Sequence, residues 1–213
     1  KRLKVLEEEL NRYLASEYGI SQNNFKSKQS YEKKFSEWLT SHKPFHWFIE
    51  FHAIMKNGGF DVIIGNPPYV ESGKIKKEYT VRGYQTEDCG NLYAYAIERS
   101  YEILKNKSRF GMIVQLPLVC TDRMKPLQRE CLGKSLAIWF ANFDDRPARL
   151  FEGLEHIRAT IVTAKKGKEN YKVFSTNYNR WYSEIRTALF ESIFYEEIAS
   201  FLTEGSIPKI GSI

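Results

Sequence analysis

One short segment, Phe60 to Tyr69 with the sequence FDVIIGNPPY, constrains the fold of this chain more than any other feature. Its first six residues are mostly apolar and end in glycine, which is typical of a strand buried within a parallel sheet. The tetrapeptide Asn66 to Tyr69 would then follow the carboxyl end of that strand, where open α/β sheets bind their ligands. We therefore expect a parallel sheet with a functional site at this strand end.

The tetrapeptide is stiff and rich in hydrogen-bond acceptors. Pro67 and Pro68 each fix φ, lack a backbone N–H and hold the preceding residue out of the helical region. The Asn66 side chain and the Pro67 carbonyl could together accept both hydrogens of one amino group, while Tyr69 offers a flat face to a planar ring. Asn-Pro alone would indicate only a turn, but the whole tetrapeptide after a buried strand favours a site for an aromatic amine or an amide.

The segment from Phe60 to Tyr69 resembles motif IV of the amino-methyltransferases that use S-adenosylmethionine. Other segments resemble the large adenine-specific DNA methyltransferases of type IIG restriction-modification systems: KPFHWFIEF at 43–51, GNLY at 90–93, RFGMIV at 109–114, NFDDRP at 142–147 and LFEG at 150–153. The resemblance extends over roughly residues 40 to 213. It implies an α/β fold: the C-terminal half of a doubly wound, Rossmann-like methyltransferase sheet with flanking helices.

Hydrophobic patterning predicts alternating strands and helices after residue 58. Strands are expected at 60–65, 110–116, 136–143 and 159–164, and helices at 92–104 and 122–132. The strand–helix–strand order implies parallel pairing. The last two strands are expected to form an antiparallel pair at the edge of the sheet.

Three parts are expected along the chain. Residues 1–42 form a helical segment, with helices over about 2–18 and around Tyr31 to Leu39. Residues 43–170 form the C-terminal part of a methyltransferase catalytic domain. Residues 171–213, which include an aromatic-rich stretch predicted to be helical, form a helical linker toward a DNA target-recognition region.

Composition narrows the class of protein. A hydrophobic fraction of 42% suits a globular core, and a net charge of +6 is compatible with a polyanionic partner. The three cysteines show no CxxC spacing and fit a reducing cytoplasm. No transmembrane run or signal peptide is apparent, so no membrane partner is expected.

The spacing of the histidines and acidic residues does not indicate a metal site. His42, His46 and His52 do not match a common zinc spacing. The Glu32-Lys33-Lys34 triplet has the Glu-x-Lys form of metal-dependent nucleases, but such sites need an upstream Asp, and the first Asp in the chain is Asp61.

The resemblance implies methyl transfer from S-adenosylmethionine to the exocyclic N6 of an adenine flipped out of double-stranded DNA, within a restriction-modification system. Asn66, Pro67, Pro68 and Tyr69 are the expected catalytic residues. Accepting both amino hydrogens would localise the nitrogen lone pair and stabilise the positive charge that develops during transfer. Tyr69 would stack on the flipped ring.

Further contacts are expected around this centre. Asn66, Asn91 and Tyr93 would contact the cofactor, although Asn91-Leu92-Tyr93 also reads as an ordinary helix start. Phe151 would contact the base, with a plain core position as the alternative. Basic side chains after the tetrapeptide would contact phosphates, unless they form only a solvated loop. These basic residues are Lys74, Lys76, Lys77 and Arg82.

No glycine-rich turn that could hold the cofactor precedes residue 60. In the resembled family that turn precedes the tetrapeptide, so we expect it upstream of Lys1 and expect these 213 residues alone to be inactive. Two other functions stay open. One is a protein glutamine or RNA amino-methyltransferase with the same Asn-Pro-Pro-Tyr chemistry, and the other is a catalytically idle DNA-binding segment.

Overall fold

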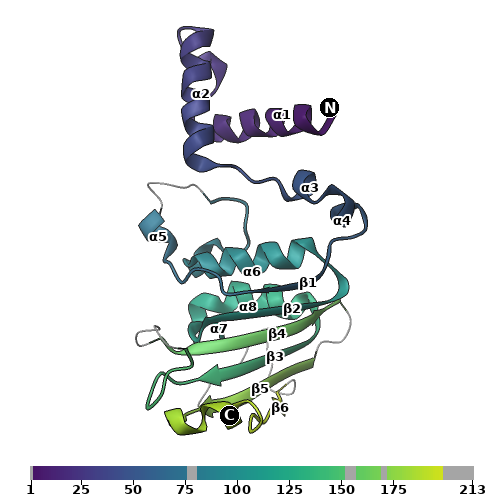
Figure 1. Ribbon diagram of the computed structural model, residues 1–213, viewed down its shortest axis with the longest axis vertical. Coiled ribbons are helices and arrows are strands. Elements are labelled where there is room, and N and C mark those ends of the chain that lie inside the picture. The colour runs from purple at the N-terminus through teal and green to yellow at the C-terminus, as the bar shows by residue number, and fades with distance from the viewer. Residues whose placement is uncertain (1, 76–80, 152–156, 169–171, 199–213) are drawn as a thin grey trace. The chain divides into compact units, whose positions relative to one another are not determined.

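The computed structural model contains two compact units, Lys1–Asn57 and Gly58–Ile213, which we describe separately. The residues described are 2–75, 81–151, 157–168 and 172–198 (Figure 1). The boundary at residue 57 separates two units that are each compact in space. The functional boundaries expected at residues 42 and 170 are of a different kind and stay a prediction. Across the described ranges, no helix combines the length and the apolar character needed to cross a bilayer.

The first unit is a pair of helices followed by short helical turns. Its elements are α1 (Arg2–Glu17), η1 (Gln22–Asn24), α2 (Lys28–His42), α3 (Trp47–Glu50) and α4 (His52–Lys56). Tyr31, Phe35 and Trp38 of α2 are buried together with Ala15 of α1. Arg12 joins the two helices through an ion pair with Glu32 at 3.2 Å. The two helices expected here are confirmed.

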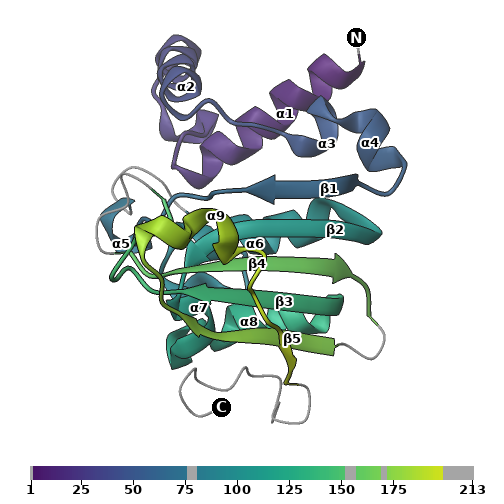
Figure 2. The ribbon, with the colours of Figure 1, turned by 60° about the horizontal axis from the view of Figure 1, so that its bottom comes forward.

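The second unit is built on one mixed sheet with the strand order β1-β2-β4-β3-β5-β6 (Figure 2). The strands are β1 (Phe60–Gly65), β2 (Leu104–Gln115), β3 (Ser135–Phe143), β4 (Ala159–Lys166), β5 (Lys172–Asn179) and β6 (Glu196–Glu197). β1 is parallel to β2 and β3 to β5, whereas β4 is antiparallel to both β2 and β3. The predicted α/β class and the antiparallel pair β3–β4 are confirmed.

The position of that pair is a correction. β4 lies between β2 and β3, and β5 and β6 continue the sheet beyond β3, so β3 and β4 are interior strands. Residues 172–179 were expected to belong to a helical segment, but they form β5. β-Branched and aromatic residues such as Val173, Phe174 and Tyr178 favour a strand, which explains the difference. Of the helix expected over 181–201, only η4 (Ser183–Ile185) and the single turn α9 (Arg186–Leu189) are helical up to residue 198.

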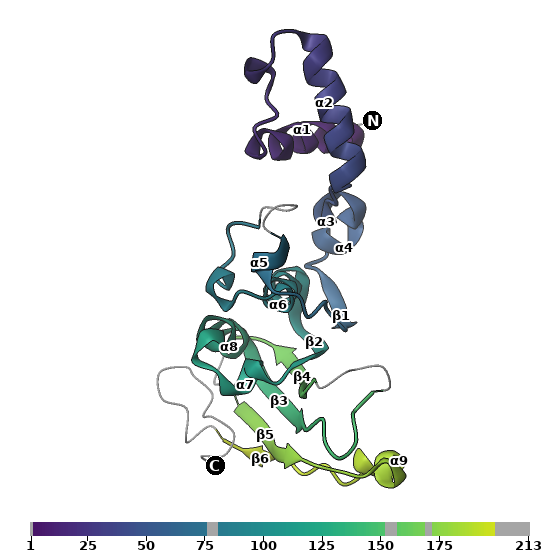
Figure 3. The same cartoon turned by 90° about the vertical axis from the view of Figure 1, so that its left-hand side faces the viewer.

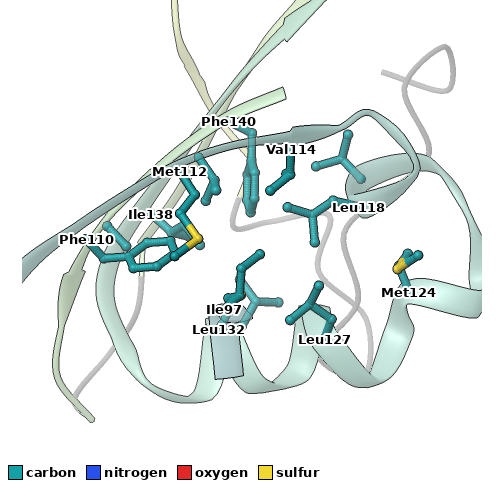
Figure 4. Close-up of a cluster of buried hydrophobic side chains, with 14 of the residues drawn as sticks. Ile97, Phe110, Met112, Val114, Leu118, Met124, Leu127, Leu132, Ile138 and Phe140 are labelled. Atoms are coloured by element: carbon teal, nitrogen blue, oxygen red, sulfur yellow. The ribbon is translucent and has the colours of Figure 1, made fainter. Parts of the chain in front are cut away.

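Helices α6 (Leu92–Ile103) and α8 (Lys125–Gly133) cover one face of this sheet (Figure 3). The short elements α5 (Ser72–Ile75), η2 (Glu87–Cys89), α7 (Pro117–Cys120) and η3 (Asp122–Met124) connect them. Side chains from the sheet, such as Val114 and Phe140, interdigitate with Ile97, Leu127 and Leu132 of the helices (Figure 4). Burying each such side chain stabilises the fold by about 1.5–3 kcal/mol.

A smaller cluster packs on the other face, near the carboxyl ends of the strands. Phe143 meets the ring of Trp181 edge-on, with centroids 5.6 Å apart, and Leu189 of α9 joins them. This cluster holds the chain after β5 against the sheet.

Strand β1 is parallel, as predicted, but it is not buried. Val62 is 57% exposed and Ile64 is 78% exposed. β1 is the outermost strand of the described sheet and is paired on one side only, with β2. The apolar run therefore predicted the strand correctly and its burial wrongly.

Candidate active site

The ends of β1, β2 and β3 meet at one border of the sheet, which we call the carboxyl edge. Gln115 and Phe143, the last residues of β2 and β3, flank the same residue, Ala159 of β4. Gly65, the last residue of β1, pairs with Met112 of β2. The tetrapeptide Asn66–Tyr69 and the loop that begins at Asp144 therefore leave the sheet at the same edge, although 78 residues separate Asn66 from Asp144 in the sequence.

Main-chain hydrogen bonds fix the exit of the tetrapeptide. The Leu92 N–H donates to the Val70 carbonyl at 2.9 Å, and the Ser72 N–H donates to the Gly90 carbonyl at 3.0 Å. These bonds hold the chain after Tyr69 against the start of α6. Gly90 adopts φ +65°, and a Cβ there would overlap the Arg123 guanidinium, so this junction requires glycine.

Asn66 lies at the surface of this edge, and Pro67 beneath it is buried. Within the described part of the chain, no group forms a hydrogen bond with the Asn66 side chain. Its amide oxygen is therefore available to accept a hydrogen from a ligand. The stiff Pro67-Pro68 backbone limits how far it can move.

Tyr69 is half-buried and tethered. Its hydroxyl donates to the Ile113 carbonyl of β2 at 2.9 Å, and its ring meets Tyr93 edge-on at 6.4 Å. Burial raises the pKa of the Tyr69 hydroxyl, so the phenol stays neutral. The tether fixes the position of the ring tip, and the edge-on packing against Tyr93 limits rotation of the ring.

A cavity of about 250 Å³ lies at the start of α6, and its lining includes two of the predicted cofactor contacts, Asn91 and Tyr93, but not Asn66. Asn91 caps α6 by accepting from the Tyr93 N–H at 3.3 Å, and its amide lies 3.4 Å from the Gln115 side-chain oxygen. Tyr93 is fully buried, and its hydroxyl donates to the Met124 sulfur at 3.4 Å. Asn91 is thus an ordinary helix start and a cavity-lining residue at once.

Sequence reasoning missed four polar residues of this cavity, namely Glu71, Gln115, Thr121 and Arg123. Gln115 is the last residue of β2, so the rule that ligands bind at carboxyl ends could have identified it. Glu71 and Arg123 lie on connecting segments that carry no comparable signal.

Asp144 is the centre of an ionic network in the second loop. It is only 3% exposed, and its carboxylate accepts from Arg180 Nε at 2.7 Å and Arg158 Nε at 3.3 Å. It also accepts from the Asp145 N–H at 2.8 Å. Burial alone would raise the pKa of Asp144, but the neighbouring Tyr178 hydroxyl and these donors outweigh burial and hold the pKa well below its usual range.

Phe151 ends the described part of this loop and is 36% exposed. Leu150 fills the core position instead, in the cluster with Trp181. The core alternative for Phe151 is therefore wrong, and its side chain is accessible to a ligand.

Only two of the four predicted phosphate contacts lie within the described residues. Lys74 in α5 and Arg82 are exposed, whereas Lys76 and Lys77 lie outside the described residues. Over the described ranges, no group of three or more His, Cys, Asp or Glu residues could hold a metal ion.

Comparisons with known proteins agree on one family. The sequence model of the family described as "Eco57I restriction-modification methylase" matches residues 4–148. A protein of Methanocaldococcus jannaschii, whose name describes it as a type II restriction enzyme and methyltransferase, is 34% identical over 106 residues. Those residues are 47% of this chain and 9% of that protein.

Solved structures share the fold. A nuclease-deletion mutant of the type ISP restriction-modification enzyme LlaGI, in complex with a DNA substrate mimic, superposes with a TM-score of 0.56 at 15% identity. The match covers 74% of this chain and 19% of LlaGI. The DrdV–DNA complex superposes with a TM-score of 0.52 at 13% identity, over 70% of this chain and 18% of DrdV. This chain thus spans less than a fifth of either protein.

Proposed function

The chain belongs to the Eco57I restriction-modification methylase family, and we propose that it contributes the substrate side of a DNA methyltransferase active site. The proposed reaction transfers a methyl group from S-adenosylmethionine to the exocyclic N6 of adenine in double-stranded DNA, within a restriction-modification system. The observation that carries this proposal is the exposed Asn66 on a rigid backbone at the carboxyl edge, with a side chain that no described residue hydrogen-bonds.

The amino group of adenine is a weak nucleophile, because its lone pair is delocalised into the ring. The Asn66 amide oxygen and the Pro67 carbonyl would accept its two hydrogens and so localise the lone pair. The same two oxygens would stabilise the positive charge that develops on nitrogen as the methyl group is transferred. The stiff backbone holds the Pro67 carbonyl and the Cα of Asn66 in place, which reduces the reorganisation needed at the moment of reaction.

The adenine must leave the duplex to reach this edge, at a cost of a few kcal/mol. Tyr69 would receive the flipped ring, since the hydroxyl tether to Ile113 and the edge-on packing against Tyr93 hold its own ring in place. Phe151, accessible on the neighbouring loop, would contact the base from a second side. Lys74, Lys76, Lys77 and Arg82 would contact DNA phosphates. The net charge of +6 and the DNA bound in the LlaGI and DrdV structures support DNA as the partner.

S-adenosylmethionine, when bound, supplies the electrophilic methyl group. The cavity at the start of α6 offers Glu71 and Gln115 as oxygen acceptors for the cationic end of such a cofactor, with Asn91 and Tyr93 in its wall. Its volume of about 250 Å³ is below the range of roughly 300–1,000 Å³ that whole small-molecule ligands occupy. These residues therefore fit only part of the cofactor. We expect the 213 residues alone to bind it weakly and to be inactive.

Methyl transfer from labelled S-adenosylmethionine to duplex DNA tests the proposal, measured with the complete gene product. Asn66→Ala should lower the rate by about 10²–10³-fold, the usual effect of removing one preorganised polar group. Asn66→Asp keeps acceptor oxygens and should retain more activity than Asn66→Ala. Asn23→Ala, at an exposed asparagine of η1, is the matched control and should leave the rate unchanged.

The labelled product distinguishes the other functions. N6-methyladenine in DNA supports the proposal, and methylated glutamine in a peptide or a methylated RNA base would replace it with a different substrate. DNA binding with no methylation of any substrate would show an idle DNA-binding segment and overturn the proposed reaction.

A further inference from the structure

A second cavity lies at the opposite border of the sheet, which we call the amino edge. It has a volume of about 580 Å³ and is bounded by the start of β2, the start of β3 and the end of β4. Four lysines from three segments line it, namely Lys107, Lys134, Lys166 and Lys168. We call this cavity the lysine pocket. Seven residues of β4, or roughly 23 Å at 3.3 Å per residue, separate Lys166 from the carboxyl edge.

Positive charge in the lysine pocket is only partly neutralised. Glu102 is the one acidic residue in the described lining, and it already pairs with Arg99 at 2.7 Å. Lys134 pairs with Glu130. Among the described residues, no acidic side chain forms a salt bridge with Lys107, Lys166 or Lys168. An anion that entered the pocket would therefore meet an excess of cations.

Lys166 is anchored in the wall of the pocket. Its Nζ donates to the carbonyls of Tyr101 and Leu104, at the C-terminal end of α6. Burial lowers the pKa of Lys166, and the nearby ammonium groups of Lys134 and Lys168 lower it further. A bound anion would reduce this repulsion between the lysine ammonium groups.

The backbone around the pocket is also unusual. Lys107 has φ +66°, a left-handed conformation that is costly for a residue other than glycine. It lies where β2 departs from its register with β1, between the partners of Phe60 and Val62. At Gly167, a Cβ would lie 2.2 Å from Cγ of Leu136, so the chain approaches the wall too closely for any side chain. The fold thus holds Lys107 in the lining at a conformational cost, and the close approach at Gly167 brings the chain before Lys168 against the same wall.

We propose that the lysine pocket is a binding site for a phosphate-bearing anion, separate from the site at the carboxyl edge. Its volume lies within the roughly 300–1,000 Å³ of small-molecule sites. A multiply charged phosphate suits several converging point charges, which is the way lysine binds phosphate. The phosphate could belong to a small polyphosphate compound or to the backbone of a DNA strand. This inference does not depend on the proposed methyl transfer.

Calorimetric titration with sodium tripolyphosphate, using the full chain, tests the pocket. The wild-type chain should bind with saturation, and a Lys107→Gln/Lys168→Gln double variant should bind at least tenfold more weakly. Both positions are exposed, and Lys166 is left intact because it bonds to main-chain carbonyls. Lys165→Gln is the matched control, because alternation along β4 places Lys165 on the opposite face from Lys166, and its affinity should change less than twofold.

Absence of saturable tripolyphosphate binding by the wild-type chain would overturn the proposal. Equal weakening by Lys165→Gln would also overturn it, because the effect would then be one of net charge. Circular dichroism must first show that the variants remain folded. A short duplex DNA then identifies the source of the phosphate. If the duplex and tripolyphosphate compete for binding to the chain, the pocket is assigned to a DNA backbone. If the two bind independently, the pocket is assigned to a small phosphate compound.

Discussion

Two loops at the carboxyl edge of the sheet are held in place by different forces. The loop Asn66–Tyr69 depends mainly on the covalent stiffness of two consecutive prolines, with one tether from the Tyr69 hydroxyl to the Ile113 carbonyl, and the Asn66 side chain forms no hydrogen bond with the described residues. The loop that begins at Asp144 depends on a buried carboxylate with several donors. One edge of the sheet therefore carries an asparagine side chain that is open to a ligand and, on the neighbouring loop, a carboxylate that already has its hydrogen-bond donors.

The difference between the two loops predicts which of them depends on charge and pH. Asn66 and the prolines carry no ionisable group, so their geometry is insensitive to pH. Asp144 is held by two arginines and a main-chain N–H, so the second loop should respond to loss of the carboxylate and to its protonation.

The largest effect should come from Asp144→Ala. The substitution removes the acceptor of the Asp145 N–H and of Arg180, and we expect the free energy of unfolding to fall by about 1.5–3 kcal/mol. The estimate stays modest because the Arg158 and Arg180 side chains are 58% and 69% exposed and remain solvated after the change. Urea denaturation at pH 7 measures the loss.

Asp122→Ala is the matched control for that substitution. Asp122 is an exposed aspartate that pairs with Lys125 across one turn at 3.4 Å, and such pairs contribute little. We expect a change below about 0.5 kcal/mol. Similar losses in the two variants would show that the network at Asp144 does not stabilise its loop.

A smaller effect should appear in the pH dependence of stability. The pKa of Asp144 is lowered in the folded state, so its contribution is complete above the unfolded pKa of about 3.9 and is lost as the pH falls toward the folded pKa. Between pH 7 and pH 3, the wild-type chain should lose about 1 kcal/mol more than Asp144→Asn. Thermal denaturation at both pH values gives the comparison. Equal losses of stability in the wild-type chain and in Asp144→Asn would mean that the pKa of Asp144 is not lowered in the folded state.

The sequence predicted the first loop more fully than the second, for a physical reason. The stiffness of Asn66–Tyr69 is encoded in four adjacent residues and needs no distant partner. The Asp144 network needs Arg158 and Arg180, which are 14 and 36 residues away and arrive only because β4 and β5 flank β3. Local patterns cannot show such pairings.

The same reasoning explains the errors in the fold. The apolar run of β1 indicated a strand, but its burial depends on what lies beside it, and Ile64 is exposed at the outer strand of the described sheet. β4 was expected beside β3 and is there, but its second partner β2 comes from far earlier in the chain. The four lysines of the lysine pocket are likewise scattered over about 60 residues, so no local motif marks them.

The smallest effect should come from Pro68→Ala, which tests whether stiffness holds the first loop. Pro68 is exposed, so alanine removes little packing, and its main consequence is a larger conformational freedom of the unfolded chain. We expect the free energy of unfolding to fall by about 0.4–1 kcal/mol, the usual size of a proline effect. The loss should be the same at pH 7 and pH 3, in contrast to the loss at Asp144. Urea denaturation at both pH values checks this, and a loss that changed with pH would mean that the first loop also depends on ionised groups, which would remove the distinction between the two loops.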